Sequence, residues 1–135
     1  MKTLRNKCLT ALQLMKRLET ANDEGYCECR SCGKWQQWNE MDGGHFVPKG
    51  KGGQNSWALV EENVWPQCKG CNGFQAKYGK ANQLYTCWMI DHFGREFVDE
   101  MLQTNPVRKY SKADLEDMLF GFNEHIRFHK KRLGV

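Results

Sequence analysis

The feature that most constrains this chain is a pair of Cys-x-x-Cys motifs, Cys29-Arg-Ser-Cys32 and Cys68-Lys-Gly-Cys71. Each motif places two thiolates on one tight turn, and Zn²⁺ prefers four such ligands in a tetrahedron. The cysteines therefore predict a zinc site that joins two distant segments of the chain. Because four thiolates leave no open position for water, we interpret this Zn²⁺ as structural rather than catalytic.

The other three of the seven cysteines lie outside these motifs. Cys27 offers a competing ligand, but the motif spacing favours Cys29 with Cys32 and leaves Cys27 as a spare thiol nearby. Cys8 and Cys87 lie on apolar faces of expected helices, where a free cysteine behaves as a small core residue. A redox role for the motifs is the alternative, and the lack of a βαβ pattern weakens it. The odd number of cysteines argues against a closed disulfide framework.

The length and charge of the chain limit its class. At 135 residues it is expected to form a single domain over residues 1–135. A net charge of +4 permits a nucleic-acid partner without requiring one. No apolar run approaches the roughly 20 residues of a membrane span, and residues 1–7 are not followed by the apolar segment of a secretory signal. We therefore expect no membrane partner and a cytoplasmic location, where thiols stay reduced.

Hydrophobic periodicity and turn signals predict an α+β fold that is mostly helical. The chain divides into an N-terminal helix, a short and broken central part with both cysteine motifs, and a helical C-terminal part, over residues 4–21, 27–80 and 81–135. Gly94 is expected to divide the helical residues 81–103 by forming a left-handed C-terminal cap. Ser111, with Asp114, resembles an N-cap that begins a last helix over residues 112–132.

The last helix has an apolar stripe that fits two partners. The stripe could pack on helix 4–21 or join two chains in a homodimer, and the sequence leaves both open. Its basic end, residues 129–132, suits the helix dipole and could equally contact DNA. The stripe consists of Leu115, Leu119, Phe122, Ile126 and Leu133.

Within the central part we expect one or two short strands in residues 35–47 and a mobile loop over residues 48–56. A helix should begin near Cys68 or Cys71 and continue toward Ala76, because this leaves the ligands on its first turn. The tryptophans of this part are interpreted as core around the zinc site rather than as platforms for bases. They are Trp35, Trp38, Trp57 and Trp65.

His45 is the histidine whose neighbours suit catalysis. It lies between the cysteine motifs in Asp42-Gly43-Gly44-His45-Phe46, where two glycines let another backbone approach. An imidazole here could deprotonate a water molecule that attacks a phosphodiester. A nearby Mg²⁺ or Mn²⁺ would stabilise the charge that develops on the phosphate. The spacing alone leaves this role and an ordinary structural histidine equally open.

A cationic loop follows His45. Lys49 and Lys51 lie in this glycine-rich loop, which could follow a phosphate backbone, and Lys69 and Lys77 extend the positive surface. An ordinary solvated loop is the alternative.

Together these motifs resemble the HNH (ββα-metal, His-Me finger) nucleases, and more narrowly the phage recombination endonucleases of the NinG/Rap type. The resemblance covers roughly residues 27–103. It rests on the first Cys-x-x-Cys, on Gly44-His45-Phe46, on Asn63-Val64-Trp65-Pro66-Gln67-Cys68-x-x-Cys71-Asn72, and on a segment from Tyr85 to Glu100.

The resemblance implies a zinc-bound ββα-metal (HNH) core and a role for each matched residue. His45 matches the general base, Asn63 the residue that braces the loop and orients this base, and Asn72 a ligand of the catalytic Mg²⁺ or Mn²⁺. Many members carry a further ligand, an Asp, directly before the catalytic His. Here that position is Gly44, and Asp42, two residues earlier, is the candidate substitute.

The resemblance further implies a metal-dependent DNA endonuclease that hydrolyses phosphodiester bonds. Its substrate would be branched DNA such as Holliday junctions, or duplex DNA that it nicks, during phage recombination or replication in the host cytoplasm. A non-catalytic zinc-binding adaptor for DNA or protein is the alternative, in which Gly44 marks lost activity. If His45 is the base, activity should fall as the pH drops through its pKa, ordinarily about 6.5.

Overall fold

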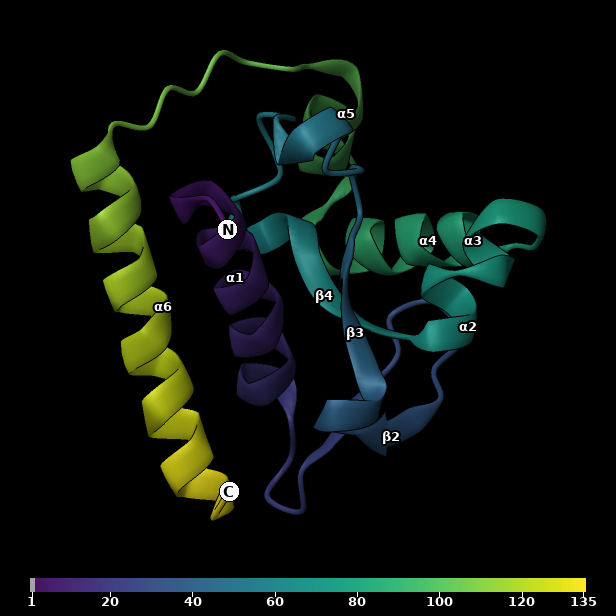
Figure 1. Cartoon of the computed structure of the whole chain (residues 1–135). Coiled ribbons are helices and arrows are strands. Elements are labelled where there is room, and N and C mark those ends of the chain that lie inside the picture. The colour runs from purple at the N-terminus through teal and green to yellow at the C-terminus, as the bar shows by residue number, and fades with distance from the viewer. Residues whose placement is uncertain (1) are drawn as a thin grey trace.

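The computed structural model of the protein describes residues 2–135 and confirms an α+β fold that is mostly helical (Figure 1). The helices are α1 (Leu4–Thr20), α2 (Lys69–Asn72), α3 (Phe74–Tyr78), α4 (Ala81–Phe93), α5 (Arg95–Gln103) and α6 (Lys112–Leu133). The strands are β1 (Tyr26–Glu28), β2 (Trp35–Gln37), β3 (Met41–His45) and β4 (Val64–Cys68). Among the helices of residues 2–135, none is long and apolar enough to cross a membrane.

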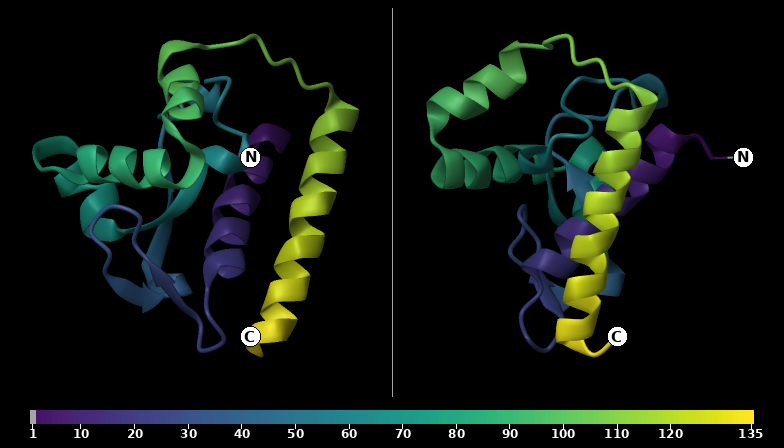
Figure 2. Two further views of the ribbon diagram at one scale, coloured as in Figure 1. Left: turned by 180° about the vertical axis from the view of Figure 1, so that it is seen from behind. Right: turned by 90° about the vertical axis from the view of Figure 1, so that its left-hand side faces the viewer.

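Helix α1 is the central element of the fold. It begins where the Thr3 side chain accepts a hydrogen bond from the backbone N–H of Asn6. Its apolar residues recur at three-to-four spacing, and Leu12, Met15 and Leu18 are fully buried. Figures 1 and 2 show α1 between α6 on one side and the strands β3 and β4 on the other. This helix therefore joins the C-terminal helix to the segment that carries His45.

Strands β3 and β4 form an antiparallel pair that α2 follows directly. Their register places Met41 opposite Cys68 and His45 opposite Val64. The backbone of α1 lies directly against β3, since a Cβ at Gly43 would stand 2.7 Å from Gln13 Cα. Glycine is therefore required at position 43 for this packing.

The apolar stripe of α6 packs on α1, so the intramolecular partner is the correct one of the two that the sequence allows. Phe122 and Ile126 are buried in one cluster with residues of α1. At the far end, Arg132 Nη2 donates to the carbonyls of Leu18 and Ala21, at 3.1 and 3.0 Å. The Leu18 carbonyl also accepts from the Ala21 N–H, and Arg132 adds bonds to both carbonyls at the C-terminal end of α1. The N-cap at Ser111 is confirmed, with a capping box.

Two expectations about helix breaks need correction. The helix expected from the second cysteine motif toward Ala76 is two short helices, because Gly73 has non-helical angles of φ −110° and ψ −101°. Gly94 does separate α4 from α5, but its φ of 88° and ψ of 154° are not a left-handed cap. Glycine adopts this backbone conformation readily, and residues that carry a side chain rarely do.

The expectation that the tryptophans surround the cysteine cluster was wrong for three of the four. Trp38 packs against that cluster. Trp57 and Trp65 belong instead to an apolar cluster with α4 and α5. Trp35 is 53% exposed, because β2 pairs with β1 in a small separate sheet.

Two cysteines assigned to helix cores have different surroundings. Cys8 is buried, and its thiol donates to the Leu115 carbonyl of α6 at 3.3 Å. Cys87 is exposed on α4, so its assignment was wrong. Periodicity did not identify which face of α4 contacts the rest of the molecule.

The close approach of α1 to β3 predicts that Gly43→Ala destabilises the protein. The added Cβ has no room, and overpacking of this kind typically costs about 1–3 kcal/mol. Urea unfolding followed by circular dichroism measures the change. Gly70→Ala is the matched control, because a Cβ there meets nothing within 4 Å. Equal free energies of unfolding for Gly43→Ala and the wild type would contradict this packing.

Candidate functional site

The four motif cysteines form one compact sulfur cluster. The Sγ atoms of Cys29, Cys32, Cys68 and Cys71 all lie within 4.8 Å of one another, and Cys32 Sγ is 3.8 Å from Cys68 Sγ. A tetrahedral zinc with Zn–S bonds of about 2.3 Å separates its sulfurs by about 3.8 Å. The cluster therefore fits a structural Zn²⁺. Over residues 2–135 no other group of three or more His, Cys, Asp or Glu side chains is arranged to hold a metal ion.

Backbone hydrogen bonds shape both cysteine turns. The N–H of Cys32 donates to Cys29 Sγ and the N–H of Cys71 donates to Cys68 Sγ, each at 3.5 Å. Such donors favour the thiolate form that a metal requires. The first turn follows β1, and the second ends β4 and begins α2. The cluster thus fixes where α2 starts.

Cys27 lies outside the cluster, as the motif spacing predicts. It is buried, and its thiol donates to the Arg17 carbonyl of α1 at 2.9 Å. Thr20 Oγ1 donates to the same sulfur at 3.8 Å. The thiol of Cys27 therefore joins β1 to α1.

His45 ends β3 with one ring nitrogen engaged. Nε2 lies 2.8 Å from the Ala58 carbonyl oxygen. Because a carbonyl can only accept, Nε2 carries the hydrogen and Nδ1 keeps its lone pair. Burial lowers the pKa of His45 to about 4, with the Lys49 ammonium acting in the same direction. At neutral pH the imidazole is therefore uncharged and Nδ1 can accept a proton.

Asn63 is fully buried, and it joins the segment after His45 to the segment before Ala58. Its Nδ2 donates to the carbonyls of Val47 and Trp57, at 2.9 and 3.1 Å, and its Oδ1 accepts from the N–H of Val47 at 2.7 Å. Val47 follows β3, and Trp57 precedes Ala58. Asn63 therefore braces the loop that places a carbonyl against His45.

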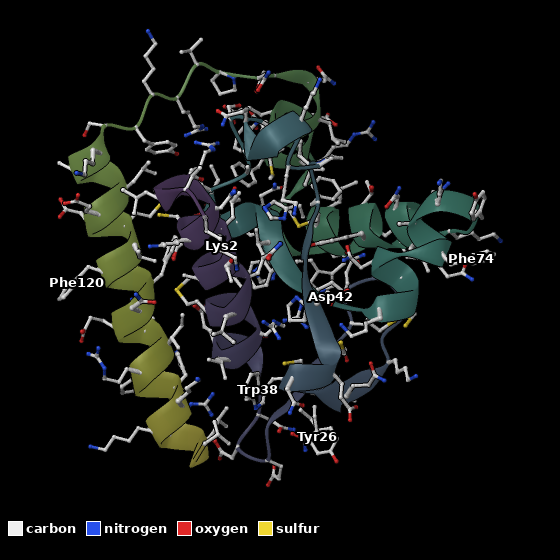
Figure 3. The ribbon with its side chains drawn as sticks, viewed as in Figure 1. Lys2, Tyr26, Trp38, Asp42, Phe74 and Phe120 are labelled. Carbon is white, nitrogen blue, oxygen red and sulfur yellow. The ribbon has the colours of Figure 1, made fainter. Side chains whose placement is uncertain are left out.

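Asp42 and Asn72 lie in contact between β3 and α2. Asn72 Nδ2 donates to Asp42 Oδ2 at 3.1 Å, and Lys69 Nζ donates to Asp42 Oδ1 at 2.7 Å. Partial burial acts to raise the pKa of Asp42, but the hydrogen bonds from Lys69 and Asn72 outweigh it and hold the pKa below its ordinary value. Figure 3 shows Asp42 on β3 near the centre of the molecule. A carboxylate beside a carboxamide offers the oxygen ligands that Mg²⁺ prefers.

Two neighbouring hollows connect these residues. His45 and Asn72 both line one of about 470 Å³, whose rim also includes Lys49. Asp42 and Asn72 line the next, of about 430 Å³. Asn72 thus stands between the candidate base and the candidate carboxylate ligand. The fold brings the three residues to one region, but Asp42 and His45 do not line the same hollow.

Packing accounts for glycine, rather than a residue with a ligand side chain, at position 44 directly before His45. A Cβ at this position would lie 1.9 Å from Gln67 Oε1. Gln67 is itself buried and donates through Nε2 to Ser31 Oγ of the first cysteine turn, at 2.8 Å. The Gly44 carbonyl accepts a hydrogen bond from the Tyr85 hydroxyl at 2.7 Å. A ligand side chain directly before His45 is thus sterically excluded while Gln67 keeps this position.

The four lysines expected to contact DNA are all exposed. Lys49 lies on the rim of the His45 hollow, and Lys51 is in a loop that Arg5 Nε anchors through the Gly53 carbonyl at 2.7 Å. Lys69 is paired with Asp42, and Lys77 lies on α3. Contact with DNA stays a prediction for all four.

Sequence reasoning missed an exposed aromatic pair on α3. Phe74, which is labelled in Figure 3, is 66% exposed. Tyr78 is 69% exposed, and the centroids of the two rings are 5.1 Å apart. Lys77 Nζ lies 5.6 Å from the centroid of the Tyr78 ring. Aromatic residues two and six positions after the candidate metal ligand Asn72 are the signal that could have identified this pair.

Comparison with protein-family models matches residues 7–132 to the family described as Bacteriophage Lambda NinG protein. The match extends from within α1 to nearly the end of α6, so it is wider than the motif resemblance. The comparisons with curated proteins and with solved structures gave no match.

The sulfur cluster predicts that Cys68→Ser loses both zinc and structure. Removing a thiolate weakens metal binding, and metal binding free energy is also folding free energy at such a site. The metal content of natively purified protein, with its thermal unfolding, measures both effects. Cys87→Ser is the matched control, since that thiol is exposed and outside the cluster. Zinc well below one per chain in the wild type would contradict the assignment.

Proposed function

This chain belongs to the family described as Bacteriophage Lambda NinG protein, which is associated with phage recombination, and we propose that it is a metal-dependent DNA endonuclease of the HNH class. The observation that carries the proposal is the state of His45. Nε2 of its ring donates a hydrogen bond to the Ala58 carbonyl, and Nδ1 is left as an uncharged acceptor. The side chain lines a hollow together with Asn72. The succession of β3, β4 and α2 also supports it, because this is the element order of a ββα unit.

His45 would act as the general base. Its Nδ1 would accept a proton from the water molecule that attacks the phosphodiester. The imidazole would then be charged, and the hydrogen bond from Nε2 to the Ala58 carbonyl would strengthen. Asn63 would keep that carbonyl in place, so it is a positioning residue rather than a catalytic one.

Asp42 and Asn72 would hold the catalytic Mg²⁺ or Mn²⁺. The chemistry that this ion supplies when bound is stabilisation of negative charge on the phosphate and leaving oxygen. A carboxylate, a carboxamide and the phosphate itself suit Mg²⁺, which usually binds one or two carboxylates and keeps several waters. When the ion is bound, the ion pair between Lys69 and Asp42 would open, and the Lys69 ammonium could then contact DNA.

The expected substrate is branched DNA such as a Holliday junction, with nicking of duplex DNA as the nearest variant. The recombination association of the family favours branched DNA. Lys49, Lys51, Lys69 and Lys77 would bind phosphates beside the site. Phe74 and Tyr78 add a surface on which unpaired bases could stack.

The proposal predicts that His45→Ala loses cleavage of plasmid and four-way-junction DNA with Mg²⁺. Loss of a general base typically lowers the rate by about 10²–10⁴-fold. The zinc content and the circular dichroism spectrum of the folded protein should be kept, which separates lost chemistry from lost structure. His92→Ala is the matched control, because His92 is an exposed histidine that stacks on Trp88.

Two outcomes would contradict the catalytic assignment. One is equal cleavage by the wild type and His45→Ala. The other is two proteins that bind DNA and are equally inert, which would favour the zinc-binding adaptor.

Burial of His45 predicts an unusual pH profile. The uncharged imidazole is the base, so lowering its pKa extends activity to lower pH. With a pKa of about 4, the single-turnover rate should stay level between about pH 5 and 8 instead of falling near 6.5. Quench-flow cleavage with Mg²⁺ measures this profile, and NMR titration of His45 measures the pKa directly. A midpoint near 6.5 in both would contradict the burial of the imidazole.

A further inference from the structure

Helix α6 has a second face, which is exposed. Its inner face packs on α1, and its outer face is directed away from the rest of the molecule (Figures 1 and 2). Phe120 is 68% exposed and Phe128 is 65% exposed. At 100° per residue, the exposed residues within about 80° of Glu124 on the outer face are Ala113, Asp114, Glu116, Asp117, Phe120, Glu124, Arg127, Phe128, Lys131 and Arg132.

Four residues of this outer face are placed symmetrically about Glu124. Phe120 precedes Glu124 by four positions, and Phe128 follows it by four. Asp117 precedes it by seven, and Lys131 follows it by seven. The two phenylalanines are therefore related by this symmetry, and so are the acidic Asp117 and the basic Lys131. A face of this kind is complementary to itself when two copies run in opposite directions.

We propose that the outer face of α6 is a homodimer interface, in which two copies pack antiparallel about a two-fold axis at Glu124. Phe120 would then contact Phe128 of the second copy, and Asp117 would pair with Lys131 of the second copy. Each contact occurs twice, as a two-fold interface requires. Removing four phenylalanine rings from water supplies the driving force.

Glu124 lies on the proposed axis, so it would face Glu124 of the second copy. Two Glu124 carboxylates would repel each other, but Arg127 already forms an ion pair with Glu124 in the same chain. Arg127 would also lie close to Glu124 of the second copy, so two guanidinium groups would neutralise two carboxylates at the centre.

A second copy suits this face better than DNA does. Of the acidic residues on this face, Glu116 and Glu124 are paired with Lys112 and Arg127, and Asp117 would repel phosphates. The candidate nuclease site lies on the other side of α1 (Figure 1). Dimerisation through α6 would therefore leave both sites open, and the proposal does not depend on the proposed function.

Charge reversal tests the pairing directly. By sedimentation analysis without DNA, the wild type should be a dimer that Asp117→Lys or Lys131→Asp weakens by about tenfold or more, because like charges then oppose each other twice. The double variant should restore the dimer, since the exchanged charges attract again. Asp91→Lys and Lys109→Asp are matched controls, with the same charge changes at exposed sites off this face.

Cross-linking tests the axis. In a Cys87→Ser background, Glu124→Cys should form a disulfide-linked dimer under mild oxidation, because the two copies of this position meet. Ala113→Cys should not, since its two copies would lie about 33 Å apart along the helices. A monomeric wild type, single reversals without effect, or a dimer that Glu124→Cys does not cross-link would each overturn the proposal.

Discussion

The four-sulfur cluster is the constraint on which the candidate site depends. Helix α2 has four residues, far fewer than the roughly 12–15 at which an isolated helix becomes even marginally stable. Its position therefore comes from Cys68, which caps its N-terminus, and from Cys71 within it, because both join it to the first cysteine turn. Asn72 is the next residue, and it reaches Asp42 because α2 starts where the cluster places it.

The two glycines of β3 connect packing to chemistry. Gly43 lets α1 lie against the strand, and Gly44 leaves room for the buried side chain of Gln67. A side chain directly before His45 would therefore clash with Gln67 in its present position. Asp42 supplies a carboxylate at the start of the same strand, in contact with Asn72. Gly44 thus does not by itself favour the adaptor over the nuclease.

The surroundings of His45 show how a fold sets the state of one side chain. The Ala58 carbonyl selects the tautomer, burial keeps the ring uncharged, and Asn63 holds the two segments together. Each partner is distant from His45 in sequence. A histidine with an ordinary pKa of about 6.5 is the reasonable expectation until these partners are known.

Local chemistry made much of this protein predictable from its residues alone. The cysteine spacing identified the four members of the sulfur cluster, the periodicity identified α1, and Ser111 and Gly94 marked helix boundaries, because spacing, caps and backbone freedom act over a few residues. Tertiary structure decided the rest. It buries Cys8 and exposes Cys87, places Trp57 and Trp65 in a separate apolar cluster, joins Asp42 to Asn72 and lowers the pKa of His45. Burial and pairing depend on residues far apart in the chain, and their contacts exist only after the chain has folded.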